Sequence, residues 1–102
     1  MAQFDIHRNA RSTLYPLLVD VQSDLLSRLA TRIVVPLMPR KRYTGKPPTK
    51  LTFLTAVRGV DYVVVVPELA AIPTATLGEV IGSLAARRAD LVTAFDLLLT
   101  GV

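Results

Sequence analysis

The sequence contains no cysteine and no tryptophan, and its 102 residues include one histidine and eight carboxylates. Without cysteine, the chain has no means of forming disulfide bonds, thiolate catalytic sites, cysteine-ligated zinc sites or iron–sulfur clusters. No stretch approaches the roughly 18 consecutive apolar residues of a membrane span, and the first residues form no apolar signal-peptide region. We therefore expect a cytoplasmic protein with no membrane partner and no cofactor.

Apolar residues are abundant instead: 51% of the chain is hydrophobic and 20% is charged, with a mean hydropathy of +0.43. These values exclude a disordered chain. The length matches one domain, since domains typically have roughly 100–200 residues, so we expect a single domain over residues 1–102. A domain this small buries a limited share of its surface, and the surplus of apolar residues therefore favours a homodimer.

The net charge of +4 is concentrated in one region, because five of the 12 basic residues lie between residues 40 and 50. Three prolines and a glycine in the same region predict an exposed loop over residues 38–50. Only Tyr43 lies among these charges, so an acidic protein partner or plain solvation is favoured over nucleic acid. The basic residues are Arg40, Lys41, Arg42, Lys46 and Lys50.

Alternating and β-branched apolar runs predict a series of strands. Phe4 and Ile6 are expected on the inner face of the first, and Pro36 and Pro39 are expected to stop the third because proline donates no ladder hydrogen bond. A hairpin turn is expected at residues 58–61, with its glycine at positive φ. The expected strands cover residues 3–7, 17–22, 33–35, 51–57 and 62–66, with an extended edge segment at 70–77.

Near the end of the chain the apolar spacing becomes helical, which predicts one helix over residues 84–99 that packs on the sheet. Ser83 is its expected N-cap and Gly101 its expected C-cap. Strands followed by a single terminal helix indicate a mainly β (α+β) protein, built on an antiparallel sheet or small barrel.

The chain has few groups for catalysis. His7 is expected to be a solvated residue at a strand end, because a lone histidine there is seldom a base. Asp20 and Asp24 are expected to make turn and edge hydrogen bonds, since two carboxylates alone are a poor metal site. No metal site is predicted.

Two stretches resemble the CcdB family of toxins. They are Leu-Val-Asp-Val-Gln-Ser-Asp-Leu-Leu at residues 18–26 and Thr-Arg-Ile-Val-Val-Pro-Leu at residues 31–37. The start of the chain, residues 71–73, the terminal helix and the last two residues fit as well, whereas residues 40–65 fit loosely.

The resemblance implies an SH3-like antiparallel sheet or partial barrel, as in CcdB and the MazF/Kid toxins, with a small accessory sheet, a C-terminal helix and a homodimeric assembly. Members of the family are the toxins of type II toxin–antitoxin pairs. They bind the DNA gyrase A subunit and trap the gyrase complex with cleaved DNA. They are not enzymes, read no DNA sequence directly, and are neutralised by a CcdA-like antitoxin.

Carried over from the family, the gyrase-binding surface lies at the end of the terminal helix, with flanks from other segments. The chains of the family usually end in Trp-Gly-Ile, and here Thr100 stands at the position of the tryptophan. The expected gyrase-binding residues are Asp96, Leu99, Thr100, Gly101 and Val102, with Phe4, Leu25 and Leu26 as flanks. The basic residues between 40 and 50 are the expected dock for the acidic antitoxin, by charge alone.

Two alternatives stay open at this point. One is an endoribonuclease of the MazF/Kid kind, with Arg32 and His7 as catalytic groups and the basic loop holding RNA. The other is a module that still binds its antitoxin but no longer poisons gyrase.

Overall fold

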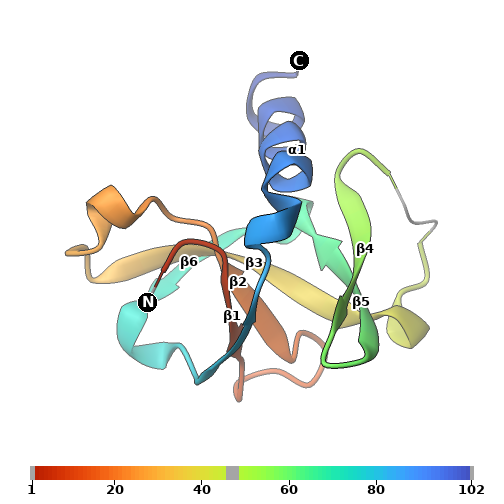
Figure 1. The fold of residues 1–102 in the computed structure, drawn as a ribbon, viewed down its shortest axis with the longest axis horizontal. Coiled ribbons are helices and arrows are strands. Elements are labelled where there is room, and N and C mark those ends of the chain that lie inside the picture. The colour runs from red at the N-terminus through yellow and green to blue at the C-terminus, as the bar shows by residue number, and fades with distance from the viewer. Residues whose placement is uncertain (1, 46–48, 102) are drawn as a thin grey trace.

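The computed structural model describes residues 2–45 and 49–101. Seven strands form one connected antiparallel sheet in the order β4-β5-β3-β2-β1-β7, and β6 pairs with β3 beside this path (Figure 1). The strands are β1 (Asp5–Arg8), β2 (Leu17–Asp20), β3 (Thr31–Pro39), β4 (Thr52–Val57), β5 (Val60–Val65), β6 (Ala70–Pro73) and β7 (Val80–Ser83). Short 3-10 turns are η1 (Asp24–Leu26), η2 (Arg40–Arg42), η3 (Val66–Glu68), η4 (Thr74–Thr76) and η5 (Ala85–Arg87), and the helix is α1 (Arg88–Thr100).

The long strand β3 organises the sheet. One of its edges pairs with β2, while the other pairs with β6 over Thr31 to Val34 and with β5 over Leu37 to Pro39. On the edge shared by β6 and β5, Pro36 lies between the two pairings, where the missing N–H of proline removes no ladder hydrogen bond. The prediction that Pro36 stops the strand was therefore wrong, because a proline is tolerated where one strand changes partners. The strand ends instead at Pro39, the second proline expected to stop it.

The hairpin of β4 and β5 is confirmed, and its turn is tighter than predicted. Arg58 and Gly59 form the whole connection, with φ of 50° and 79°. Two successive positive φ values match the twist of the strands on either side. The mainly β architecture with one terminal helix is confirmed as well. The expected accessory sheet is not separate, since this hairpin continues the main sheet through β3.

The core lies between one face of the sheet and α1. Leu91 and Ala94 of the helix are buried against a cluster of strand residues, with Phe95 and Leu98 packed beside them. The predicted helix starts too early, because the Ser83 hydroxyl accepts a hydrogen bond from the Ala85 amide and supports the 3-10 turn η5 instead. The predicted C-cap is confirmed.

Strand β7 has no counterpart in the sequence-based predictions. It pairs with β1, and Gly78 directly precedes this region. A Cβ on Gly78 would lie 2.5 Å from the Arg8 carbonyl oxygen, so only glycine allows the two segments to approach this closely. None of the helical segments within residues 2–45 and 49–101 reaches the length and apolar content of a membrane span.

Candidate functional site

The end of α1 projects from the sheet (Figure 1). Leu99 is 73% exposed there, and Asp96 and Thr100 are exposed too. Gly101 ends the helix at φ 76° and donates its amide hydrogen to the Leu97 carbonyl at 3.0 Å. A left-handed cap of this kind satisfies the last carbonyls and leaves the helix end open to a partner. Val102 lies outside the described residues.

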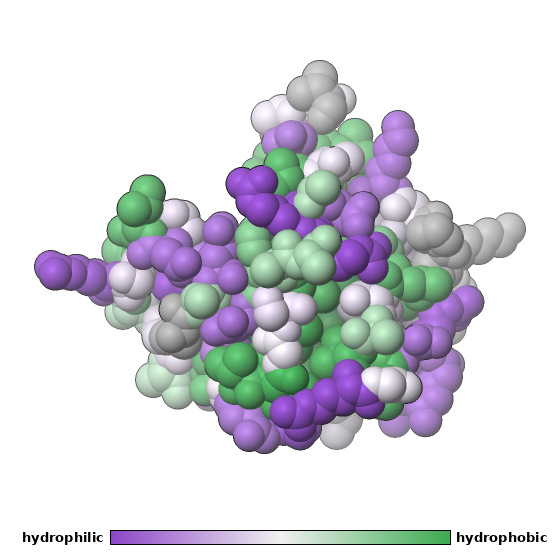
Figure 2. All heavy atoms as spheres, viewed as in Figure 1, coloured by the Kyte–Doolittle hydropathy of each residue, from purple (hydrophilic) through white to green (hydrophobic). Residues whose placement is uncertain are grey.

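A second projection is the η1 turn between β2 and β3. Leu25 is 94% exposed, and Leu26 and Leu29 are each about half exposed. Figure 2 shows hydrophobic atoms at the tip of this projection, on the left of the view. Exposed leucines this close together are unusual on a surface that meets only water, and such patches mark interaction sites.

A groove of about 450 Å³ connects the two projections. Leu26 lines one side and Leu99 and Phe95 line the other, so residues some 70 positions apart meet across it. The remaining lining residues are Val21, Gln22, Ser23, Ile33 and Leu69. The wall is mostly apolar, which suits the apolar side chains of a protein partner.

The structure thus brings together two of the residues expected to bind gyrase, Leu26 and Leu99, whereas Leu25 is exposed on the same η1 turn without lining the groove. Phe4 lies elsewhere: it is 6% exposed and belongs to the core, where its φ of 72° turns the chain into β1. The isolated chain therefore offers almost none of Phe4 to a partner.

The sequence-based prediction missed most of the groove wall. Gln22, Ile33 and Phe95 were read as parts of a strand, a strand and a helix face, with no role in binding. Gln22 offered the one available signal, since a glutamine at the end of an apolar strand needs hydrogen-bond partners when buried.

The basic residues of the 40–50 region form a different kind of surface. Arg40, Lys41 and Arg42 make up η2 and are exposed, as is Lys50. None of the four forms an ion pair with another residue of the described chain. Lys46 lies outside the described residues. The cluster therefore presents uncompensated positive charge to solvent.

His7 is not the solvated residue that the sequence predicted. It is 1% exposed, and Nδ1 lies 2.9 Å from the Gly78 carbonyl oxygen, to which it donates. Its hydrogen-bond partner Gly78 lies in the segment just before β7, a strand that was not predicted. The imidazole is inaccessible to a macromolecular substrate.

Arg32 is fully buried as well, in an ion pair with Asp20 (2.6 Å from Nη2 to Oδ2) whose two side chains are both 0% exposed. Asp20 was expected to make turn and edge hydrogen bonds, and it does accept one from the Gln22 amide. The expectation was nevertheless wrong about its setting, because it treated Asp20 as a turn residue without a charged partner. Asp24 accepts a hydrogen bond from the Gln3 amide, in line with the expectation, and its Oδ1 also lies 3.9 Å from Arg32 Nη2, a charged partner that was not expected.

A second hollow, of about 300 Å³, lies over the other face of the sheet, between the β1–β2 loop and β6. Tyr15 and Arg11 line it together with Glu68. Burial raises the pKa of the Tyr15 phenol, and the negative charge of Glu68 raises it further. Tyr15 is therefore a neutral hydrogen-bonding group at physiological pH. No group of three metal-ligating side chains occurs among the residues whose placement is described.

Comparison with known proteins bears on the family and the fold. The family model described as CcdB protein matches residues 3–101. Among solved structures, an endoribonuclease in complex with its cognate antitoxin, from a mycobacterial species, superimposes with a TM-score of 0.75. The match covers 97% of this chain and 94% of that one, at 14% sequence identity. At this identity the likeness shows the fold alone.

Proposed function

Because the chain belongs to the CcdB family of type II toxin–antitoxin toxins, we propose that it binds the DNA gyrase A subunit and traps the gyrase complex with cleaved DNA. The observation that carries the proposal is the apolar groove between α1 and the η1 turn, which joins Leu26 and Leu99 in one surface. On this proposal the protein is a poison of another enzyme rather than an enzyme itself, and it acts in the cytoplasm, where gyrase works.

The end of α1 supplies the central contact in this proposal. An exposed apolar side chain at Leu99 and a glycine at the cap allow close approach of a partner surface. Asp96 and Thr100 lie exposed beside them, and the Thr100 hydroxyl donates to the Asp96 carbonyl oxygen at 2.6 Å. Leu25 and Leu26 extend the contact to the η1 turn. Val102 is assigned to the same surface from its position in the chain.

The burial of Arg32 and His7 argues against the endoribonuclease alternative. A catalytic acid or base has to reach within hydrogen-bond distance of the substrate proton. Both side chains are almost wholly buried, and the Arg32 guanidinium is engaged with Asp20. Cleavage of RNA by the purified protein, lost on changing either residue, would revive that alternative.

We also propose that the basic cluster of Arg40, Lys41, Arg42, Lys46 and Lys50 binds an acidic segment of the cognate antitoxin. The four described members, Arg40, Lys41, Arg42 and Lys50, are exposed and form no ion pair with other described residues. Such cations attract an acidic chain and raise its association rate. The described residues share one sheet and one core, which supports the proposal of a single toxin domain over residues 1–102. The surplus of apolar residues in a chain this small, with 51% of it hydrophobic, supports a homodimer.

A DNA-cleavage assay tests the gyrase proposal. Purified protein is mixed with gyrase, ATP and supercoiled plasmid, and trapped linear DNA is measured for the full chain and for a chain lacking residues 100–102. We expect linear DNA with the full chain only. Its absence with a folded full chain contradicts the proposal for the gyrase tested.

A pair of matched point variants locates the contact within the chain. Leu99→Ser and Leu14→Ser each remove an exposed leucine, but Leu14 lies in the β1–β2 loop and outside the groove. We expect Leu99→Ser to weaken gyrase binding at least about tenfold, as loss of an apolar anchor does, and Leu14→Ser to leave it unchanged. Equal effects of the two variants would show that the groove is not the gyrase contact.

A further inference from the structure

The η1 turn raises a structural question, because its exposed leucines lie on a segment with little backbone support. Strand β2 ends at Asp20 and β3 begins at Thr31, and η1 itself has only three residues. Its backbone bonds are all local: the amides of Leu26, Ser27 and Leu29 donate to the carbonyls of Ser23, Asp24 and Leu26, respectively. A turn this short, pointing into solvent, is ordinarily mobile.

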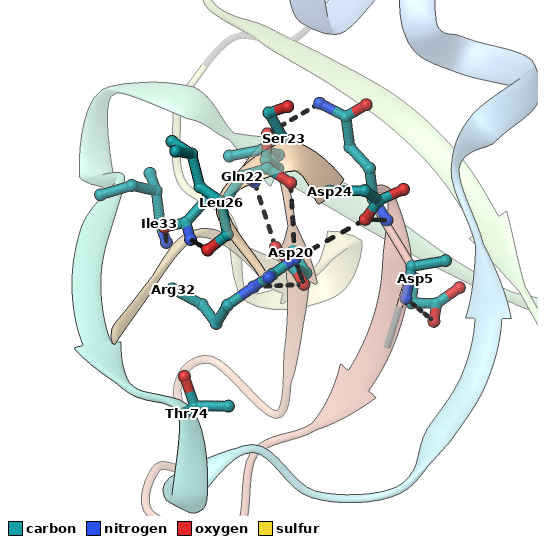
Figure 3. Close-up of polar contacts among 12 residues, drawn as sticks. Asp5, Asp20, Gln22, Ser23, Asp24, Leu26, Arg32, Ile33 and Thr74 are labelled. Atoms are coloured by element: carbon teal, nitrogen blue, oxygen red, sulfur yellow. Dashed lines mark hydrogen bonds and ion pairs between the residues drawn. The ribbon is translucent and has the colours of Figure 1, made fainter. Parts of the chain in front are cut away.

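Buried polar side chains hold the base of this turn (Figure 3). Arg32 donates from Nε to Asp20 Oδ2 at 2.9 Å and pairs with the same oxygen through Nη2. Nη2 also reaches the Gln22 carbonyl oxygen at 3.4 Å and lies 3.9 Å from Asp24 Oδ1. A single guanidinium therefore contacts three residues at the point where the chain leaves the sheet.

Gln22 connects the two ends of the turn. Its Nε2 donates to the Leu26 carbonyl oxygen at 3.0 Å, and its Oε1 accepts a hydrogen bond from the Ile33 amide at 3.2 Å. The side chain is buried and lines the groove beside Leu26. One amide group thus joins the end of η1 to strand β3.

These buried polar groups should add little to the free energy of unfolding. A buried ion pair is often no more stabilising than apolar side chains of the same volume, because both charges lose their hydration. Arg32 Nη1 has no hydrogen-bond partner within residues 2–45 and 49–101, so the charge is not fully satisfied. Unlike apolar side chains, the polar groups make directional hydrogen bonds. These bonds connect specific backbone atoms of the turn to β2 and β3.

We propose that Asp20, Gln22 and Arg32 are positioning residues, which hold the η1 turn so that Leu25 and Leu26 meet the partner together with Leu99. The proposal rests on the proposed gyrase contact of the groove. It assigns Asp20 and Arg32 no contact with the partner, since both are wholly buried. Gln22 lines the groove, but its amide group is engaged with Leu26 and Ile33. Their effect passes through the geometry of the turn.

Two variants separate positioning from folding. Gln22→Glu keeps an acceptor for the Ile33 amide but has no hydrogen to donate to the Leu26 carbonyl. The double variant Asp20→Leu, Arg32→Met replaces the ion pair by apolar side chains of similar size, which often preserves or raises stability. Thr52→Val is the matched control, because it removes a buried side-chain hydrogen bond, that with Thr49, far from the turn.

The measurements are gyrase A affinity and amide hydrogen exchange of the free protein at Leu26 and Ser27. In both test variants we expect at least tenfold weaker binding and at least tenfold faster exchange at these amides, with thermal unfolding still cooperative. Thr52→Val should lower stability and leave both readouts at the wild-type value. If the double variant does not fold, Gln22→Glu alone decides the outcome.

Folded test variants that bind gyrase as the wild type does would overturn the proposal, whether or not their exchange changes. So would weaker binding with unchanged exchange, because the turn would then not be the cause. A wild-type protein that does not bind gyrase contradicts the proposed function instead. In that event unchanged exchange in the variants would overturn the positioning role, and faster exchange would support it.

Discussion

Charged side chains occur in two contrasting environments in this molecule, one buried and one exposed. Around Arg32 the charge is buried, paired with Asp20 and tied to the backbone of the η1 turn, beside an apolar groove. Around Arg40 to Arg42 it is exposed and has no ion-pair partner within the described residues. Buried charge has given up its hydration and serves to hold geometry, whereas exposed charge remains available to a partner. The two regions are therefore suited to different partners, one apolar and one acidic.

The largest expected effect comes from unpairing the buried charge. Arg32→Met leaves the Asp20 carboxylate buried without a partner, which typically lowers the free energy of unfolding by about 3–5 kcal/mol. Arg40→Met changes an exposed residue and should stay within about 0.5 kcal/mol of the wild type. Denaturant unfolding of both variants measures the difference in free energy of unfolding. Similar values for the two would show that the buried and the exposed arginine do not differ in their contribution to stability.

Neutralising the exposed cluster should affect association rather than stability. We expect the triple variant of Arg40, Lys41 and Arg42 to Ser to bind a synthetic peptide of the cognate antitoxin's acidic segment at least about tenfold more weakly, mainly through a slower association rate. The dependence of binding on salt should become flatter, because fewer charges remain to be screened. Gyrase binding serves as the control and should not change; a parallel loss there would mean that one surface serves both partners.

A tryptophan at the helix end, as is usual in the family, should strengthen gyrase binding through the apolar surface. Thr100 is exposed at the end of α1, next to Leu99, so Thr100→Trp adds a large apolar surface without disturbing the core. An aromatic anchor at an interface is worth on the order of 1–2 kcal/mol, or about a tenfold gain in gyrase affinity. Titration at low and high salt checks this, and a gain confined to low salt would contradict an apolar contact.

The smallest expected effect concerns the cap of α1. Gly101 has φ 76° with nothing within 4 Å of an added Cβ, so Gly101→Ala introduces backbone strain and no clash. The cost should be about 1 kcal/mol, felt as fraying of the last turn. Gly82→Ala is the matched control, because Gly82 has no positive φ and its added Cβ would make ordinary contacts. Amide exchange at the helix end should rise in the first variant alone.

Features that depend on neighbours in the sequence were predicted correctly. The hairpin of β4 and β5 follows from two apolar runs around Arg58-Gly59, and the helix end follows from apolar spacing that stops at Gly101. Both are governed by local backbone preferences, which act wherever the residues lie in the fold. The edge position of β6 was anticipated for the same reason, from Pro73.

Features that depend on distant partners were missed. His7 is buried and hydrogen-bonds to Gly78, which lies 71 residues further along the chain. Pro36 remains inside β3 because two different strands share one edge of it. The groove required Leu26 and Leu99 to meet across the fold. No pattern within a short window of sequence reports such pairings, since each depends on which strands become neighbours.

By itself, the sequence determined the mainly β class, the terminal helix and its cap, the basic region and, through its resemblance, the family. Local periodicity, turn chemistry and charge carry that information without any knowledge of the fold. Only the tertiary structure decided that Arg32 and Asp20 are a buried pair while Arg40 to Arg42 remain exposed. Whether a charge is buried depends on what packs around it, and Arg32 is paired with Ile72 of β6, 40 residues further along the chain.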